Sequence, residues 1–402
     1  MSDALVLHDP RTYTHGFPYE RFRELRASDP VSHHEHPAWD RGYWAVVRHA
    51  DVQRVSRDSA TFRNAPNPFL PDAEYADDAG TSALLISLDA PEHVKLRKLI
   101  NKGFTPRRVG DLTDRIRKRV AGLIDAVADR GSCDLVEDLA LWLPLHVIAD
   151  LVGVPEADRR QVFEWTELTF GFDETVTAAQ RNEAALAMYS YADAMCVERQ
   201  SQPRDDLMSV LLYAEVDGER LTQLQIDLFF MLLQNAGSET TRNLITTGTM
   251  ALLEEPEQLE RLRGDLSLLP VAIEELLRYV TPVMQFTRNA AVDTEIAGQA
   301  IAAGDHVAMF YTSANRDAAA FEDPDRIDIT RQPNDHVAFG AGGPHFCLGA
   351  SLARLEAKEM FEAILTRFEG LEVAADPATL PRVHSNLIDG FASVPIRWSR
   401  VN

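Results

Sequence analysis

The sequence predicts a mainly α-helical, single-domain protein with a small β region, and three observations support this. Eight segments carry apolar residues at three- and four-residue spacing, the period of a helix with one buried face. Strand signals are few and short. No internal repeat, low-complexity segment or Gly/Ser-rich linker divides the 402 residues. One domain spanning residues 1–402 is therefore expected.

The elements follow from this periodicity. Helices are expected over 91–102, 107–130, 134–151, 178–200, 222–254, 256–263, 269–280 and 347–368. Strands are expected at 43–47 and in a hairpin whose arms are 294–298 and 306–310. The proline-rich segment 64–84 is longer than a simple connection needs, which is typical of a functional or mobile loop.

Composition narrows the class of partner and the compartment. The net charge of −22 argues against nucleic acid or an anionic membrane as the main partner. Residues 1–20 show neither a signal peptide nor a membrane anchor, so a cytoplasmic protein is expected. Cys133, Cys196 and Cys347 form no CxxC pair, which predicts neither a disulfide framework nor a structural zinc site. At least one thiol is free for another role.

The expected helix 222–254 has an unusual centre. Thr222 and Gln225 form a capping-box pattern at its start, and Pro256 limits its end, so the helix is about 33 residues or roughly 50 Å long. Its middle reads AGSETT, residues 236–241, where small and polar side chains replace apolar ones. In one interpretation this is a core helix whose hydroxyls bond back to carbonyls one turn earlier, with Glu239 paired to Arg242.

In the other interpretation the same stretch faces a ligand. Ala236 and Gly237 would leave room for a flat group, and Glu239 and Thr240 would face its reactive atom. The helix alone leaves both interpretations open.

A glycine-rich loop supplies the second element. FGAGGPHFCLG, residues 339–349, places Cys347 where the last expected helix begins. Backbone N–H groups and the helix dipole at this end lower a thiol pKa and suit a thiolate ligand to a metal. The glycines at 340, 342, 343 and 349 permit positive φ and close approach of a planar group. An inert buried cysteine is the alternative.

These motifs together resemble the cytochrome P-450 superfamily over nearly the whole chain. They are HVKLR from 93, AGSETT from 236, ELLR from 275, ANRD from 314, FEDPDR from 321 and FGAGGPHFCLG from 339. The resemblance implies a soluble haem-thiolate monooxygenase that binds haem b, with the thiolate of Cys347 as axial ligand. It implies that Ala236 and Gly237 form a groove for dioxygen, and that Glu239 and Thr240 deliver protons.

The resemblance also assigns supporting residues. Propionate donors are expected at His93, Arg97, Arg288 and His345, and cofactor contacts beside the sulfur at Phe339 and Gly349. Glu275, Arg278 and Arg326 are expected to form a buried structural network. The loop before Cys347 is one residue longer than the usual family loop. This longer loop is similar to that of a bacterial branch of the family that oxidises methyl-branched lipids and sterol side chains.

The expected partners follow from the same resemblance. Because the chain has no reductase domain, ferredoxin and ferredoxin reductase are expected as electron donors, with O2 and a small apolar substrate. A basic patch on the cysteine side would attract an acidic ferredoxin; its members are Arg97, Lys98, Lys102, Arg107, Arg108, Arg354 and Lys358. A haem-thiolate protein that binds ligands without turnover, and a peroxide-driven enzyme, are the alternatives.

The substrate pocket is expected to be apolar. The segments 64–71, 228–236, 282–286 and 386–391 are rich in Phe, Leu, Met and Val, and burial of each methylene contributes about 0.8 kcal/mol. A branched-chain lipid, terpenoid or sterol side chain, hydroxylated near a terminal methyl, is the expected substrate, with small aromatics and polar macrolides as alternatives. Expected substrate contacts are Phe69, Met231, Val283, Met284 and Leu387.

Overall fold

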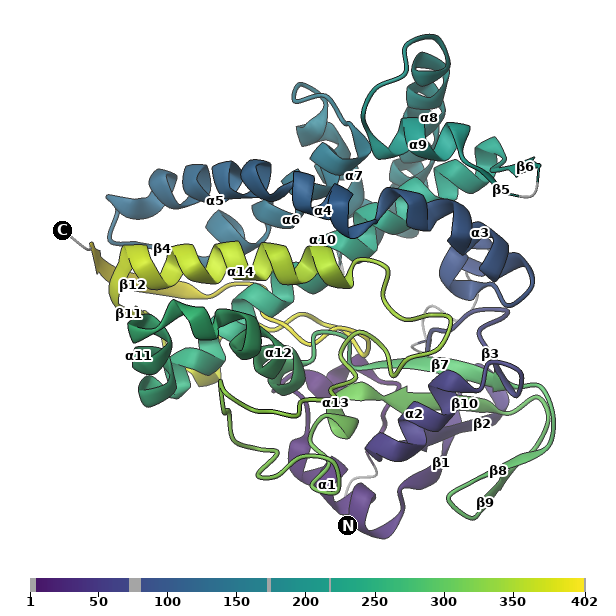
Figure 1. The fold of residues 1–402 in the computed structure, drawn as a ribbon. Coiled ribbons are helices and arrows are strands. Elements are labelled where there is room, and N and C mark those ends of the chain that lie inside the picture. Colours follow the sequence, from purple (N-terminus) through teal and green to yellow (C-terminus); the bar gives the residue numbers. More distant parts are fainter. Residues whose placement is uncertain (1–4, 72–80, 172–174, 217, 401–402) are drawn as a thin grey trace.

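The computed structural model describes residues 5–71, 81–171, 175–216 and 218–400. Residues 72–80, the middle of the expected loop 64–84, lie outside the described residues. Helices dominate the fold, as predicted, and a small sheet region lies to one side (Figure 1).

The helices occupy most of the chain. They are α1 (Tyr19–Ser28), α2 (His49–Arg57), α3 (Glu92–Ile100), α4 (Pro106–Asp111), α5 (Thr113–Ala128), α6 (Trp142–Val152), α7 (Arg159–Phe170), α8 (Ala178–Ser201), α9 (Leu207–Tyr213), α10 (Gln223–Glu254), α11 (Pro256–Gly264), α12 (Leu269–Val280), α13 (Tyr311–Ala314) and α14 (Ala350–Arg367). A short π-helical segment, Leu135–Ala140, precedes α6.

The principal sheet has five strands in the order β1-β2-β10-β7-β3. Their bounds are β1 (Val31–His36), β2 (Trp39–Val46), β3 (Phe62–Arg63), β7 (Gln285–Ala290) and β10 (His306–Phe310). A second sheet has the order β11-β12-β4, from Phe368–Val373, Pro395–Arg400 and Ser132–Asp134. Two small hairpins complete the β structure: β5 (Glu215–Val216) with β6 (Glu219–Arg220), and β8 (Thr294–Ile296) with β9 (Gln299–Ile301).

One predicted pairing is wrong. The strand at 294–296 pairs with 299–301 across a tight turn in which Ala297 and Gly298 have positive φ. The strand at 306–310 instead enters the principal sheet, parallel to β2 and antiparallel to β7. The two-residue turn closes the hairpin locally, which leaves β10 free to pair with distant strands.

The long helix α10 is the centre of the fold. Its capping box forms as predicted: Thr222 accepts a hydrogen bond from the Gln225 backbone, and the Gln225 side chain accepts one from the Thr222 backbone at 2.9 Å. Helix α10 packs against α6, α8, α12 and α14. In Figure 1 α14 lies in front of it, with α5 on one side and α11 and α12 on the other.

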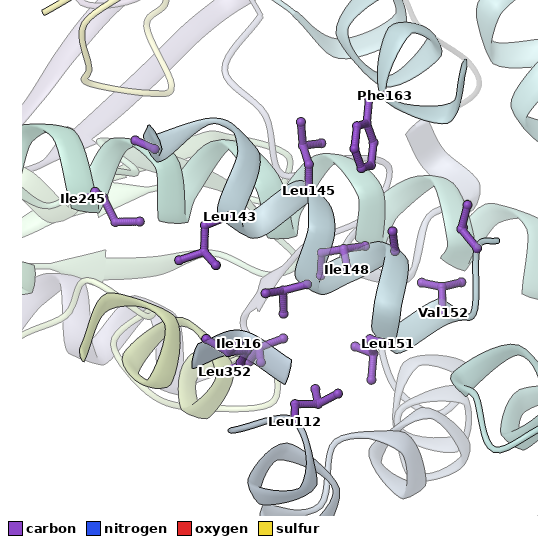
Figure 2. Packing of buried hydrophobic residues seen from close by; sticks show 14 of the residues in the cluster. Leu112, Ile116, Leu143, Leu145, Ile148, Leu151, Val152, Phe163, Ile245 and Leu352 are labelled. Atoms are coloured by element: carbon purple, nitrogen blue, oxygen red, sulfur yellow. The ribbon is translucent and has the colours of Figure 1, made fainter. Parts of the chain in front are cut away.

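Core side chains from these helices interlock at the crossing of α6 and α10. Figure 2 shows Ile148 and Leu143 of α6 between Ile245 of α10 and Leu352 of α14, and all four are at most 3% exposed. This packing makes α10 a rigid support for any group placed beside its centre.

Candidate active site

A cavity of about 240 Å3 lies between the centre of α10 and the cysteine loop, defined here as residues 335–349. Helix α10, the cysteine loop, α3, β7 and the start of α14 all contribute to its wall. The predicted site residues that line it are His93, Arg97, Ala236, Gly237, Thr240, Val283, Arg288, Phe339, His345, Cys347 and Gly349. Two elements more than a hundred residues apart therefore meet at one site, as the motifs predicted.

Cys347 is exposed to this cavity. Its backbone N–H donates to the Phe339 carbonyl at 2.9 Å, and the N–H groups of Gly349 and Ala350 hydrogen-bond to its sulfur. Helix α14 begins at Ala350, three residues later than predicted, with Gly349 as its N-cap. The sulfur is thus held in front of the helix N-terminus.

The expected lowering of the Cys347 pKa is not found. Burial raises the pKa of the thiol, and the two N–H groups, Arg97 and Arg354 oppose this effect only in part. The reason is physical, because a thiolate in a mainly apolar cavity lacks solvation unless a cation lies next to it. The site therefore suits a bound metal cation that would stabilise the thiolate.

The cysteine loop makes the backbone turns that its glycines predict. Gly340, Gly342 and Gly343 have φ of 87°, 91° and 84°. Gly349 has an ordinary φ of −82° and does not need the freedom of glycine for its backbone angle. It lies close to the sulfur instead, since a Cβ at this position would be 4.0 Å from Cys347 Sγ.

Four nitrogen-bearing side chains gather on one side of the cavity. The His93 and His345 rings lie 4.0 Å apart between centroids, and burial lowers their pKa values to about 4 and about 2. Within the described part of the chain, Nε2 of buried His93 has no hydrogen-bond partner. Arg288 is 4% exposed and donates to the carbonyl of its neighbour Thr287 at 2.7 Å.

Arg97 joins this group from α3 and donates to the Phe346 carbonyl at 2.5 Å. Burial lowers the pKa of both arginines, which shows that their charges are poorly solvated. An anionic group in the cavity would satisfy these donors. The two carboxylates of haem fit this requirement.

The centre of α10 borders the cavity opposite the cysteine loop. Ala236 is exposed to it, and Thr240 lines it. A Cβ on Gly237 would lie 2.6 Å from Cδ1 of Ile148. The glycine therefore lets α6 approach α10, and the space beside the cavity depends on Ala236.

The polar residues of this stretch also make the contacts of an ordinary core helix. Thr240 Oγ1 donates to the Ala236 carbonyl at 2.8 Å, and Ser238 Oγ donates to the Gln234 carbonyl at 2.6 Å. Glu239 forms an ion pair with Arg242 and is 6% exposed. Thr240 thus makes the back-bond of a core helix and also lines the cavity, so both interpretations apply to this residue. The expectation that Glu239 also faces the cavity is wrong.

Glu239, unlike its neighbour Thr240, is absent from the cavity wall formed by the described residues. Its side chain therefore points away from the cavity. Burial raises the pKa of its carboxyl to about 7, while Arg242 opposes this shift. A carboxyl with this pKa exchanges its proton readily near neutral pH.

Comparison with known proteins agrees with this geometry. The profile of the cytochrome P-450 family matches residues 142–386. A steroid C26-monooxygenase of Rhodococcus jostii is 39% identical over 401 residues, which cover 97% of this chain and 84% of that protein. The chain belongs to the cytochrome P-450 family. It is an oxidoreductase of the monooxygenase type, and members of the family bind haem b through a cysteine thiolate.

Further relatives and solved structures place this cytochrome P-450 among bacterial members. A methyl-branched lipid omega-hydroxylase of Mycobacterium bovis is 39% identical over 393 residues, covering 94% of this chain and 90% of that protein. A Mycobacterium marinum cytochrome P-450 in complex with pseudoionone superposes with a TM-score of 0.90 at 36% identity, covering 98% and 99% of the two chains. A Bacillus megaterium cytochrome P-450 in complex with corticosterone gives 0.85 at 34% identity, covering 94% and 98%. Among the described residues, no helix is long and apolar enough to cross a membrane.

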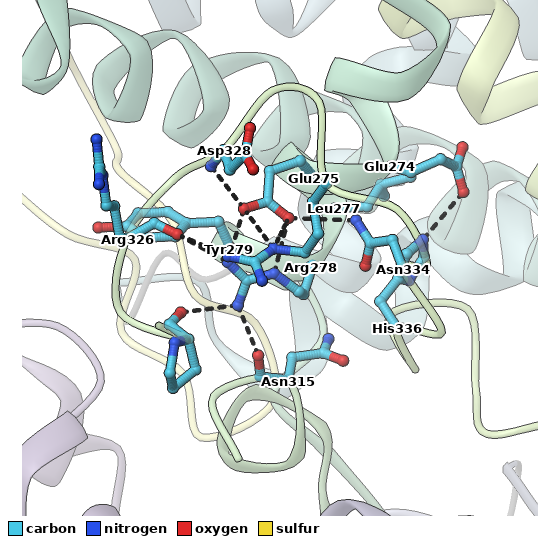
Figure 3. Close-up of polar contacts among 12 residues, drawn as sticks. Glu274, Glu275, Leu277, Arg278, Tyr279, Asn315, Arg326, Asp328, Asn334 and His336 are labelled. Carbon is cyan, nitrogen blue, oxygen red and sulfur yellow. Dashed lines mark hydrogen bonds and ion pairs between the residues drawn. The ribbon is translucent and has the colours of Figure 1, made fainter. Parts of the chain in front are cut away.

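The predicted structural network exists, with one different member (Figure 3). Arg278 donates twice to Glu275 at 2.8 Å, and both side chains are fully buried. The third side chain is Arg331, whose Nε lies 3.0 Å from Glu275. Arg326 is exposed and contributes only its carbonyl, which accepts from Arg278 at 3.1 Å. The assignment of Arg326 was therefore wrong.

Most predicted substrate contacts of this cytochrome P-450 lie elsewhere. Val283 lines the cavity, whereas Met231 and Met284 are core residues at 6% and 0% exposure. Phe69 contacts the lining residue Phe286 at 5.7 Å between ring centroids but is not in the wall. Leu387 also lies outside the wall, and its carbonyl accepts from the Met284 backbone at 2.7 Å.

The apolar wall comes in part from the expected segments 228–236 and 282–286, although these members were not named as contacts: Phe229, Leu232, Leu233, Pro282 and Phe286. Leu85, Ile86 and Phe104 also line it and lie outside every segment expected to form the pocket. The wall residues on α10 could have been found by counting back three, four and seven residues from Ala236, because these positions share one helix face. Tyr311 and Glu356, which also line the cavity, carried no recognisable signal.

Proposed function

We propose that this cytochrome P-450 hydroxylates an apolar, branched substrate at or near a terminal methyl group. Methyl-branched lipids, terpenoids and sterol side chains are the substrate class. One observation carries the proposal: the cavity beside Cys347 has a distal wall of aliphatic and aromatic side chains, with Thr240 and Thr241 as its hydroxyl groups on α10. Burial of hydrocarbon against such a wall contributes favourable binding free energy, and few polar contacts are needed to hold the substrate.

The names of the relatives support this class. The relative from Rhodococcus jostii is a steroid C26-monooxygenase, and the relative from Mycobacterium bovis is a methyl-branched lipid omega-hydroxylase. The neighbours of known structure were solved with corticosterone and pseudoionone. All four names refer to apolar molecules of similar chemistry.

Residues around the cavity take distinct roles in this proposal. Cys347 would provide the thiolate ligand of haem b, and His93, Arg97, Arg288 and His345 would bind its propionates. When bound, haem supplies the activation of O2 and the insertion of one oxygen atom into a C–H bond. The apolar wall excludes water and holds the substrate chain against the haem face.

Proton delivery falls to Thr240 and Glu239. The hydroxyl of Thr240 now donates to Ala236, so its oxygen can accept a hydrogen bond from the cavity side. Because the pKa of Glu239 is raised to about 7 by burial, its carboxyl is protonated in part of the molecules at neutral pH, and this form would supply the proton while the ionised form pairs with Arg242. In this proposal the buried acid is the proton source, and the Thr240 hydroxyl is the group that passes the proton into the cavity.

Electrons come from a ferredoxin and its reductase, which dock at the cysteine side. Lys98 on α3 and Arg107 on α4 are exposed, and Phe346 of the cysteine loop is 41% exposed, with its carbonyl held by Arg97 of α3. An acidic ferredoxin fits a surface with exposed cations and one exposed aromatic residue.

A binding screen by haem spin-state shift tests the substrate class. We expect strong low-spin to high-spin shifts with branched fatty acids, isoprenoids and sterols that carry an aliphatic side chain, and hydroxylation at a terminal methyl with a ferredoxin system. Shifts only with polar or charged small molecules would refute the substrate class and leave the monooxygenase assignment intact.

The thiolate assignment has its own test. The ferrous, CO-bound protein is expected to show the Soret band of a thiolate-ligated haem, and Cys347→Ala to lose it. Cys133→Ser and Cys196→Ser are controls and are expected to keep the band, because both thiols lie outside the cavity wall. An unchanged band in Cys347→Ala would end the assignment.

A further inference from the structure

Helix α2 holds the cysteine loop by two side-chain bonds to adjacent carbonyls. Ser56 Oγ donates to the Gly342 carbonyl at 2.9 Å, and Arg57 Nε donates to the Ala341 carbonyl at 3.0 Å. Ser56 is 6% exposed and reaches the cavity wall. The last turn of α2 thus fixes the loop at the GGP insertion, where it is one residue longer than expected for the family.

The other end of α2 holds the beginning of the same loop. Nε2 of His49 lies 2.9 Å from the Asp335 carbonyl. Between these two ends, Val52 and Val55 of α2 share one buried apolar cluster with Val337 of the loop. Helix α2 therefore runs alongside the first half of the loop and contacts it at both ends and in the middle.

The inserted part of the loop packs directly against the backbone of this helix. A Cβ on Gly343 would lie 2.5 Å from the Ser56 carbonyl, and φ of Gly343 is +84°. A side chain at this position would clash with the helix backbone and strain its own. The glycine thus permits direct contact between the backbones of the loop and α2.

Hydrogen bonds further along the loop connect the residues held by α2 to the backbone of Cys347. The Phe346 N–H donates to the Gly343 carbonyl at 3.3 Å, and the Cys347 N–H donates to the Phe339 carbonyl at 2.9 Å. A shift of residues 341–343 therefore moves the residues on which the Cys347 backbone rests.

We propose that Ser56 and Arg57 are positioning residues for the Cys347 sulfur, and that α2 acts as a splint for the lengthened cysteine loop. An added residue gives a loop more conformations, and two bonds from a rigid helix remove that freedom. The splint keeps the N–H groups of Gly349 and Ala350 directed at the sulfur, and such outer contacts tune the reduction potential of a bound metal. This inference rests on the proposed ligation by Cys347.

The test uses Arg57→Met, which keeps an apolar stem and removes the donor, and Ser56→Ala. We expect each to release haem to apomyoglobin about fivefold faster than wild type, the factor that corresponds to one lost hydrogen bond. The reduction potential is expected to fall, because weaker N–H···S bonds leave more electron density on the thiolate. Ser56→Thr keeps the hydroxyl and is expected to restore both values.

Arg54→Met is the matched control, since Arg54 is exposed in the same helix. Because Ser56 also reaches the cavity, Arg57→Met is the decisive variant. A haem-release rate and potential of Arg57→Met equal to those of Arg54→Met would overturn the proposal, whatever the effect of Ser56→Ala. A wild-type protein without a thiolate Soret band would instead refute the ligation on which the proposal rests.

Discussion

Thr240 lines the cavity, and removal of its hydroxyl is expected to separate oxygen reduction from product formation. In Thr240→Ala we expect electrons still to be consumed, because the thiolate and propionate residues are untouched. Product per electron is expected to fall by about tenfold or more, with hydrogen peroxide formed instead, since a positioned proton donor contributes at least this factor. Thr240→Ser is expected to recover coupling. The measurement is product and peroxide per NAD(P)H; tight coupling in Thr240→Ala would leave the hydroxyl with a packing role only.

If Glu239 is the proton donor, as proposed, its carboxyl is expected to set the pH dependence of the reaction. Its carboxyl has a pKa of about 7, raised by burial, and the protonated form is the donor. The wild-type rate of oxygen consumption is therefore expected to fall as pH rises through about 7. Glu239→Gln cannot titrate, so a lower and flat rate is expected between about pH 6 and about pH 8. An equal pH profile in the two proteins would assign the titration to another group.

Single residues were predictable where chemistry restricts the choice of side chain. A thiolate ligand, propionate donors and an acid–alcohol pair each allow few residue types, so Cys347, Arg288 and Thr240 were recognisable. The cavity wall accepts any apolar side chain, and one step along a helix turns the side chain by about 100°. Met231 therefore packs in the core while Leu232 lines the cavity.

The network between α12 and the segment before the cysteine loop contains arginines that are expected to contribute different amounts to the free energy of unfolding. Arg278→Met leaves the fully buried Glu275 short of its main partner and is expected to cost about 3–5 kcal/mol of unfolding free energy. Arg331→Met removes the second cation and is expected to cost about 2 kcal/mol.

The control for this series is Arg326→Met. The Arg326 side chain is exposed and its carbonyl remains, so a change within about 0.5 kcal/mol is expected. Urea unfolding of the haem-loaded variants measures the three values. A larger effect for Arg326 than for Arg331 would reverse the assignment of the third arginine.

Helices and strands could be predicted from the sequence where residues close together in the chain determine where they begin and end. Helix α10 forms with its predicted cap because both partners lie within one turn. The expected helix 107–130 divides at Leu112 into α4 and α5, and the periodicity of apolar residues gives no sign of this interruption. Strand β10 pairs with β2 and β7 through contacts between segments distant in sequence, which a local pattern cannot specify.

The whole molecule carries a strong negative charge, and this alters the predicted basic patch. Arg354 is paired with Glu274, Lys358 with Glu362 and Arg108 with Asp205. These ion pairs neutralise much of the patch. The charge of a segment was readable from the sequence, but its neutralisation depends on acidic residues from other helices.

What remains of the patch is small, and α3, which carries part of it, is bonded to the loop that bears an exposed aromatic residue. Lys98 and Arg107 form no ion pair among the described residues, and Lys102, also without one, donates to the Glu215 carbonyl at 2.8 Å. Val94 and Phe346 are each 41% exposed. Arg97 binds the Phe346 carbonyl, which fixes α3 beside the cysteine loop. An acidic partner would gain electrostatic attraction from the two cations and apolar contact from Phe346.

Reduction kinetics with an acidic ferredoxin test this docking surface. In Lys98→Glu and Arg107→Glu we expect the second-order rate to fall by about tenfold at low salt, and the salt dependence to weaken, because steering by opposite charge accelerates association. In Phe346→Ala we expect a slower rate at all salt concentrations, since the lost contact is apolar. Arg21→Glu, on α1 and far from α3 in Figure 1, is expected to behave as wild type. Equal effects of the Lys98 and Arg21 substitutions would show that only the overall charge matters, and that the ferredoxin docks elsewhere.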